Sequence, residues 1–334
     1  MKRIPAALGL LAASLAPALA TKAPPFTLQS ALALAAQQGA VRIAQLALRN
    51  DRADLKRAQL NPLETRLPLL QAEQAVALDQ AKLVGALSQA RSQIVTAYCG
   101  VLEAEQQQSL ATLAASVAGE SVKIAQIQLA NGSSTQLNLQ SAEQSLASSQ
   151  KNLLAAQNGL ALADADLVNL IGPFLKLAGL GPLPPLPDSG VLKPLLAQNS
   201  SLLQAEQQVA LAKTQLAMLN PAYSSLQQIA TAKSALSQAR QARSDAQSSL
   251  LLQLKNLYDQ VVSAHKALKV ESEALSVAQA QLATDQQRYR GGLISQIQLL
   301  QSQLSEAQAA VAERQAKDAY LEAIYALQAD GGQG

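Results

Sequence analysis

Aromatic residues are almost absent from this chain of 334 residues. Two Phe, six Tyr and no Trp make up 2% of it, whereas hydrophobic residues make up 49%. A globular domain with one compact core packs more large side chains than this. Abundant Ala, Leu, Gln and Ser instead favour long helices whose backbones lie close together. We therefore expect an all-α protein.

Cysteine and histidine are nearly missing as well. Cys99 is the only cysteine, so no disulfide can form within the chain, and its place beside Tyr98 in an apolar run indicates a small buried side chain; a free thiol or an intermolecular link is the alternative. His265 has no Cys or His partner at ligand spacing, so we expect it on a helix surface. GxSxG, HExxH and phosphate-loop motifs are also lacking. We predict no cofactor, no metal and no enzymatic activity.

The first residues indicate export, and the charge balance argues against nucleic-acid binding. The 26 Lys and Arg against 23 Asp and Glu leave a formal charge of +3, which is too small to attract nucleic acid. Two basic residues precede an apolar stretch that ends in the small-x-small site Ala18-Leu19-Ala20, so residues 1–20 have the pattern of a secretory signal peptide. A retained membrane anchor is the alternative. It is disfavoured because two prolines interrupt a stretch shorter than the roughly 20 apolar residues of a spanning helix.

The sequence contains an internal duplication. Matching residues of the two copies lie 159 or 160 positions apart, and this constant offset predicts that each half is one copy of a helix, Pro-break, long helix, Gly-turn, helix unit. The matching pairs are Asn61-Pro62 and Asn220-Pro221, Tyr98 and Tyr258, and Gly132 and Gly292.

Apolar residues recur every seven positions, which is the coiled-coil period. Such a series runs through both halves, and a companion series in the first half alternates by three and four. The second half carries Leu254, Val261, Leu268, Leu275, Leu282 and Tyr289; the first carries Leu139, Leu146, Leu153, Leu160 and Leu167, with Leu110, Leu113, Val117, Ile124 and Ile127 as the companion series.

Helix breakers divide these series into hairpins. The segments 131–134 and 291–292 contain glycines flanked by heptads on both sides, so each marks a reversal from one helix to the next. Ser134 or Thr135 can cap the first returning helix, and Ser295 the second. We expect a first helical-hairpin repeat at 21–171, a Pro-rich linker at 172–194, a second helical-hairpin repeat at 195–328 and a flexible tail at 329–334.

Three segments carry a resemblance to a known family. The chain resembles the TolC-type outer-membrane efflux proteins over essentially its whole length after residue 20, and the stretch at 288–297 is similar to the YRxGxxSxxxLL-type turn at the periplasmic tip of that family's tube. The segments are Thr27 to Leu32 leading to Leu60-Asn61-Pro62; Thr96-Ala97-Tyr98-Cys99-Gly100-Val101-Leu102; and Arg288 to Ile297 with Leu299-Leu300.

The resemblance implies a trimer whose protomers contribute paired hairpins to a hollow α-helical barrel, associated with the periplasm and the outer membrane. It also implies a periplasmic membrane-fusion adaptor and an inner-membrane transporter as partners. The adaptor would dock at the two turns. The implied docking residues are Gly132, Ser133, Gly291, Gly292, Leu293 and Ile294.

The chain departs from the family pattern in two places. The family inserts a pair of transmembrane strands after each Pro-break, and the segments 63–70 and 222–230 are too short to hold two strands of roughly 9–11 residues each. The family also places acidic residues at a constriction a few positions past each tip glycine. Here the corresponding residues are the uncharged Asn138, Gln298 and Gln301, which predict weak steering of cations, unless these amides are simply solvated helix flanks.

Three functional classes are compatible with these patterns. The first is a conduit for efflux or type I secretion, and the second is a structural coiled-coil spacer of the cell envelope without a lumen. The third, a periplasmic adaptor, is disfavoured because the Val- and Gly-rich strand patterns of its β domains are not found. The conduit is the interpretation that we carry forward.

Overall fold

The computed structural model describes residues 26–61, 65–174, 176–220 and 222–331. The expected signal peptide at 1–20 and the last three residues of the expected tail lie outside these ranges. The helices are α1 (Leu28–Ala33), η1 (Leu34–Gln37), α2 (Gly39–Leu60), α3 (Arg66–Ala130), α4 (Gln136–Ile171), η2 (Ser189–Val191), α5 (Leu192–Gln198), α6 (Ser200–Met218), α7 (Leu226–Arg290) and α8 (Gln296–Gly331). Within the described ranges there is no β-strand, only an isolated parallel bridge between Phe26 and Leu177, so the all-α prediction is confirmed.

The duplication is visible in the helix lengths. Helices α3 and α7 each have 65 residues, and α4 and α8 each have 36. Each pair begins 160 positions apart, which is the offset of the repeated motifs. Both halves therefore build the same antiparallel hairpin, a long helix followed by a shorter one.

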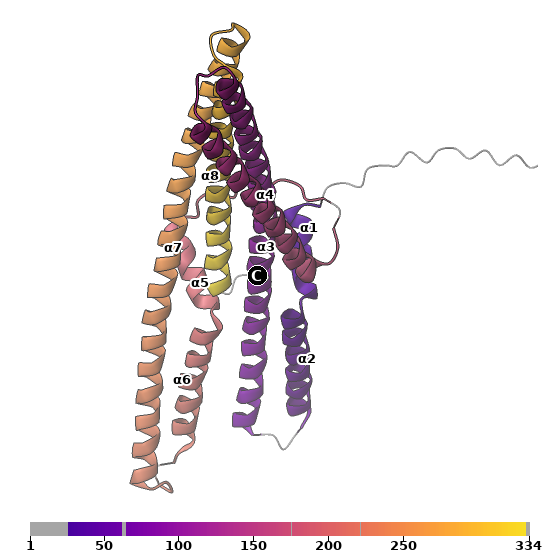
Figure 1. Cartoon of the computed structure of the whole chain (residues 1–334). Helices are drawn as coiled ribbons and strands as arrows, with labels where there is room; N and C mark the ends of the chain where they lie inside the picture. The colour runs from indigo at the N-terminus through magenta and orange to yellow at the C-terminus, as the bar shows by residue number, and fades with distance from the viewer. Residues whose placement is uncertain (1–25, 62–64, 175, 221, 332–334) are drawn as a thin grey trace, which may run out of the picture.

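The helices form an elongated layer (Figure 1). The two long helices α3 and α7 run along most of the molecule; α4 and α8 lie beside their upper parts, α2 and α6 beside their lower parts. Helix α3 packs against α2, α4, α6 and α8, whereas α7 packs mainly against α6 and α8. Helix α3 is thus interior to the layer, and α7 lies at one edge with α2 and α4 at the other.

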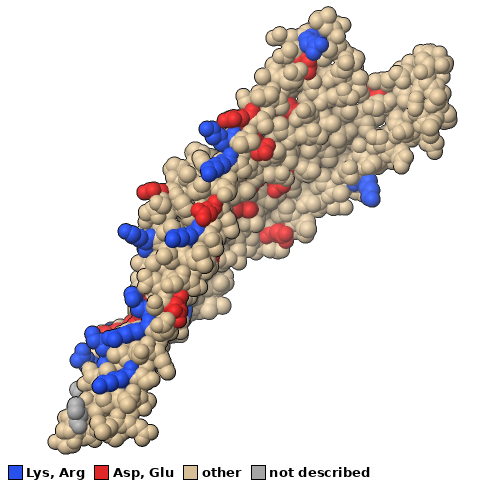
Figure 2. All heavy atoms as spheres, turned by 90° about the vertical axis from the view of Figure 1, so that its left-hand side faces the viewer, with Lys and Arg blue, Asp and Glu red and all other residues tan. Residues whose placement is uncertain are grey.

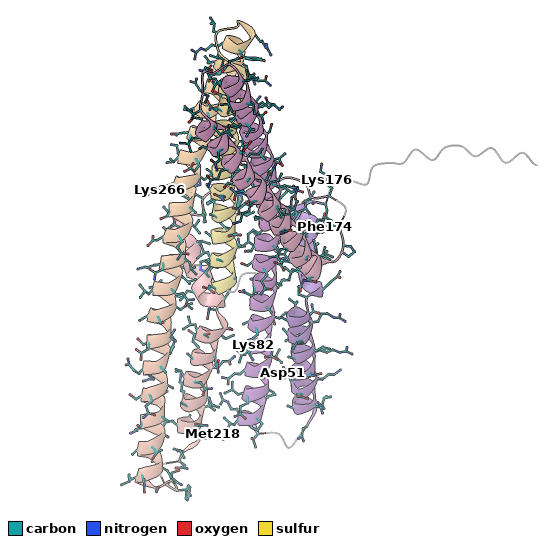
Figure 3. The ribbon with its side chains drawn as sticks, in the orientation of Figure 1. Asp51, Lys82, Phe174, Lys176, Met218 and Lys266 are labelled. Atoms are coloured by element: carbon teal, nitrogen blue, oxygen red, sulfur yellow. The ribbon has the colours of Figure 1, made fainter. Side chains whose placement is uncertain are left out.

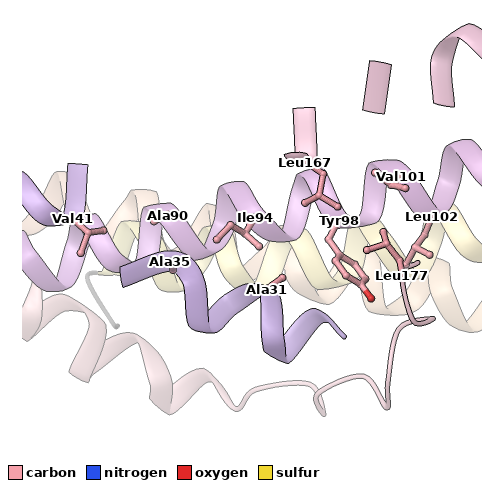
Figure 4. Packing of buried hydrophobic residues seen from close by; sticks show 10 residues of the cluster. All are labelled: Ala31, Ala35, Val41, Ala90, Ile94, Tyr98, Val101, Leu102, Leu167 and Leu177. Carbon is pink, nitrogen blue, oxygen red and sulfur yellow. The ribbon is translucent and has the colours of Figure 1, made fainter. Parts of the chain in front are cut away.

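Tyr98 lies at the centre of the largest buried cluster (Figure 4). Its hydroxyl is 2.9 Å from the carbonyl oxygen of Phe26 and 2.5 Å from that of Ala178, so it joins the first described residue and the linker to α3. Two further tyrosines hold the linker against the second half, Tyr258 through the carbonyl of Pro187 and Tyr320 through that of Pro184. The linker is therefore fastened to both repeats.

The predicted heptad series differ in how deeply their residues are buried. The α4 leucines are buried or partly buried while most of their neighbours are exposed, and Leu254 and Val261 on α7 are fully buried. The companion series on α3 is only half-buried, and Ile127 is 62% exposed. Three alanines and a valine are buried on this part of α3 instead; they are Ala111, Ala118, Val122 and Ala125.

Two expected boundaries differ from the structure. Helix α5 begins at Leu192, inside the expected linker. Pro194 is compatible with this helix because it falls in the first turn, where a missing N–H costs nothing. Helix α8 continues to Gly331 and includes the start of the expected tail. Packing holds it there: Gly331 is buried against Leu195, and the side chain of Asn199 donates to the carbonyl of Asp330 at 2.8 Å.

Candidate functional site

The two hairpin turns have the same backbone geometry. Gly132 and Gly292 both have φ of 70°, which is the left-handed region that glycine adopts without strain. The N–H of Ser133 donates to the carbonyl of Gln128 at 2.9 Å, and that of Leu293 to Arg288 at 2.8 Å. This six-to-one hydrogen bond with glycine before the donor defines a Schellman motif, which satisfies the last carbonyls of α3 and α7. Both turns lie at the upper end of the molecule (Figure 1).

Local hydrogen bonds engage two of the expected constriction residues. The N–H of Asn138 donates to the hydroxyl of Thr135 at 3.3 Å, and its side-chain amide donates to Ser134. Gln298 accepts from the N–H of Ser295 at 2.8 Å, and its own N–H donates back to the Ser295 hydroxyl at 3.4 Å, a capping box. Both residues therefore lie in the first turn of a returning helix, and the caps expected at Thr135 and Ser295 are confirmed.

A groove of about 420 Å³ lies below the second turn between α7 and α8. It contains Gln298 and Gln301 together with Ile294, which is partly buried and so differs from the exposed Leu293 beside it. The remaining lining residues are Ala278, Gln281, Asp285, Arg288, Ser302 and Ser305.

Asp285 is the buried carboxylate of this groove. Its Oδ2 accepts from Ser302 at 2.6 Å and from Gln281 at 3.0 Å, and its Oδ1 lies 3.3 Å from Arg288. The hydrogen bonds from Ser302 and Gln281, together with the Arg288 guanidinium, lower the pKa of Asp285 below its ordinary value. Asp285 therefore ties α7 to α8 with a charge-assisted hydrogen bond.

The first hairpin has no such tie, since Ala125 and Ala142 occupy the positions 160 residues before Asp285 and Ser302. Asp285 is not among the constriction residues predicted from the sequence, which all follow a turn. A signal was present: Asp285 lies three residues after Leu282, on the inner face of the heptad series, where a charge is unusual.

A second buried polar group lies at the contact of α3 with α8. Arg314 Nε donates to Asp318 Oδ2 at 3.0 Å, and the Cys99 thiol is hydrogen-bonded to the same carboxylate. Burial raises the pKa of Asp318, and burial next to Asp318 raises that of the Cys99 thiol. The prediction of a small buried cysteine is confirmed. A thiol held in its protonated form is a poor nucleophile.

Two further features are absent from the described ranges. In the part of the chain that the structure describes, no three His, Cys, Asp or Glu residues come together as metal ligands would. No helix among the described residues combines the length and the hydropathy that crossing a membrane requires.

Known structures share this fold. No protein-family model and no curated protein sequence matches the chain. A membrane protein from Pseudomonas aeruginosa superposes with a TM-score of 0.67 at 13% identity, covering 92% of this chain and 90% of that one. The outer membrane protein VceC from Vibrio cholerae gives 0.65 at 16% identity, covering 92% and 96%. The open MtrE outer membrane channel of Neisseria gonorrhoeae gives 0.63 at 16%, covering 92% and 89%.

The chain thus has the fold of TolC-type outer-membrane channel proteins. The resemblance found in the sequence is confirmed at the level of the fold.

Proposed function

We propose that this protein is the helical tunnel of an efflux or type I secretion conduit. The observation that carries the proposal is the superposition of nearly the whole chain on nearly whole outer-membrane channels, at 92% of this chain and 96% of VceC. The sequence resemblance further implies that the protein is exported and associates with the periplasm and outer membrane. It also implies coupling to a membrane-fusion adaptor and an inner-membrane transporter. In this proposal the protein is not an enzyme.

The edges of the layer support self-assembly. Large apolar side chains are exposed on α2 and α4 at one edge and on α7 at the other, whereas α8 exposes none among the described residues. Contacts between two different edges are heterologous and close into a ring when the rotation between protomers permits. A homotrimer whose edges meet in this way would enclose a lumen. The exposed residues include Ile43, Leu46, Leu137, Leu154, Leu162, Leu252, Val270 and Val277.

The adaptor would dock at the hairpin end. Leu293 is 75% exposed there, and both tip glycines have open space where a side chain would be, so a partner helix could approach the backbone closely. The proposed docking residues are Gly132, Ser133, Gly291, Gly292, Leu293 and Ile294. The proposed constriction residues are Asn138, Gln298 and Gln301.

A mass measurement combined with electron-microscopic views along the long axis tests the conduit. A trimer with a central hole is expected, whereas a solid rod would favour the envelope spacer.

Val277→Asp places a charge on the α7 edge and should lower the assembled mass, while Gln279→Asp, an exposed change on the same helix, should not. A gene deletion should increase the cellular content of an exported dye. A rod-shaped particle with unchanged export would contradict the proposal.

A further inference from the structure

The end of the molecule opposite the hairpin turns exposes apolar side chains. We call it the break end; it comprises residues 53–60, 66–73, 213–218 and 222–233, where α2 and α6 finish and α3 and α7 begin (Figure 1). Tyr223 is 90% exposed and Leu226 is 86% exposed. Leu60 and Met218 are exposed at the same end, and Figure 3 labels Met218 at the end of α6.

Charge is separated along the molecule. The described residues of 39–91 and 200–250, the half that contains the break end, hold twelve Lys and Arg against six Asp and Glu. The described residues of 92–171 and 251–331 hold nine against fifteen. Figure 2 shows blue side chains crowded toward the lower end and red ones more frequent above it. The protein is therefore a strong electric dipole although its total charge is small.

The positive charge is concentrated at the break end itself. Two acids lie there among the described residues: Asp54, which pairs with Arg57, and Glu73. The five cations of this end are Lys56, Arg57, Arg66, Lys213 and Lys233.

Two of these cations share a groove. Arg66 and Lys213 line a space of about 350 Å³ between α3 and α6, with Leu70, Ala217 and Met218 as apolar walls. Neither cation forms an ion pair with a described residue. Arg66 is also the first residue of α3, where the helix dipole disfavours a cation. A bound anion would offset that unfavourable position.

We propose that the break end binds the surface of an anionic phospholipid bilayer. The cations would contact lipid phosphates, with Arg66 and Lys213 receiving a headgroup in their groove, while Tyr223 and Leu226 enter the boundary between headgroups and acyl chains. A second copy of this chain is a poorer occupant because two positive ends facing each other repel. The proposal does not depend on whether the assembled protein conducts solutes.

Vesicle flotation tests the charge contribution. The purified protein should float with vesicles of phosphatidylethanolamine and phosphatidylglycerol, not with neutral phosphatidylcholine vesicles, and binding should weaken as salt rises. The double variant Arg66→Gln/Lys213→Gln should bind about thirtyfold more weakly. The matched control Lys266→Gln/Lys269→Gln removes two exposed cations from the other half and should bind normally. Equal binding by both double variants, or a lower assembled mass in the first, would overturn the proposal.

A fluorescent probe tests which end enters the lipid. Because the chain has no Trp, Tyr223→Trp supplies the only indole, and its emission should shift to the blue with phosphatidylglycerol vesicles and be quenched by brominated lipid. Leu293→Trp at the hairpin end should do neither. A shift at residue 293 without one at 223 would contradict the proposal, even if the protein floats with the vesicles.

Discussion

Tyr98 and Tyr258, 160 residues apart, both donate their hydroxyl groups to the linker, Tyr98 to Ala178 at 2.5 Å and Tyr258 to Pro187 at 3.2 Å. The two copies of one motif therefore hold neighbouring points of the segment that joins them. Burial raises the pKa of Tyr98 to about 12, so its hydroxyl stays a hydrogen-bond donor at any ordinary pH. The linker is part of the packed structure because of these bonds.

Removing the Tyr98 hydroxyl should destabilise the protein. Tyr98→Phe leaves the buried carbonyl of Ala178 without this donor, whereas that of Phe26 still accepts from the N–H of Ala178 at 2.8 Å. The expected cost is about 1–3 kcal/mol in the free energy of unfolding. Urea denaturation measures the change. Tyr223→Phe is the control, because that residue is 90% exposed, and it should leave the midpoint unchanged. Equal midpoints for parent and Tyr98→Phe would show that water replaces the hydroxyl.

Two leucines on α7 should respond differently to truncation. Leu254 is fully buried and Leu252 is 62% exposed. Leu254→Ala should lower the free energy of unfolding by about 2–5 kcal/mol at every protein concentration. Leu252→Ala should instead weaken assembly, visible in sedimentation at low concentration, because that side chain lies on the layer edge. Identical effects of the two changes would mean that the α7 face is wrongly assigned.

Asp285 should make the hairpin end sensitive to acid. Its pKa is lower in the folded state than the ordinary 3.8, so the stability it contributes is present above that value and is lost as pH falls through the folded-state pKa. The parent should therefore have a higher Tm than Asp285→Asn at about pH 7, and the difference should shrink as the pH falls below 3.8. Ser302→Ala should show a smaller difference at neutral pH. A Tm gap that is constant with pH would indicate that the carboxylate charge contributes nothing.

Substitutions at Gly292 can distinguish a role in docking a partner from a role in forming the turn. Gly292→Asp adds a charge where close approach is proposed and should abolish pump-dependent export while the assembly persists. No atom lies within 4 Å of the added Cβ, so the structural cost comes from φ of 70° alone, about 1–2 kcal/mol for Ala and less for Asn. Export assays and thermal unfolding of the Asp, Ala and Asn variants distinguish the two roles. Normal export by an assembled Asp variant would rule out docking at Gly292.

The helical elements and the turns could be predicted from the sequence because they depend on neighbours a few residues apart. The heptad leucines of α4, the φ of Gly132 and Gly292, and the caps at Thr135 and Ser295 all follow from local spacing and backbone sterics. The fold class followed from the repetition of these local units.

Tertiary structure decided what depends on partners far apart in the chain. Spacing on one helix could not show that Ser302 would meet Asp285 across a hairpin, nor that alanines such as Ala118 would line the α3 seam in place of Ile127. It also could not show that Arg66 and Lys213 would share one groove, since that requires α3 and α6 to lie side by side. Side-chain hydrogen bonds act over about 3 Å and charge interactions over about 10 Å, so their partners are defined only once the helices are packed.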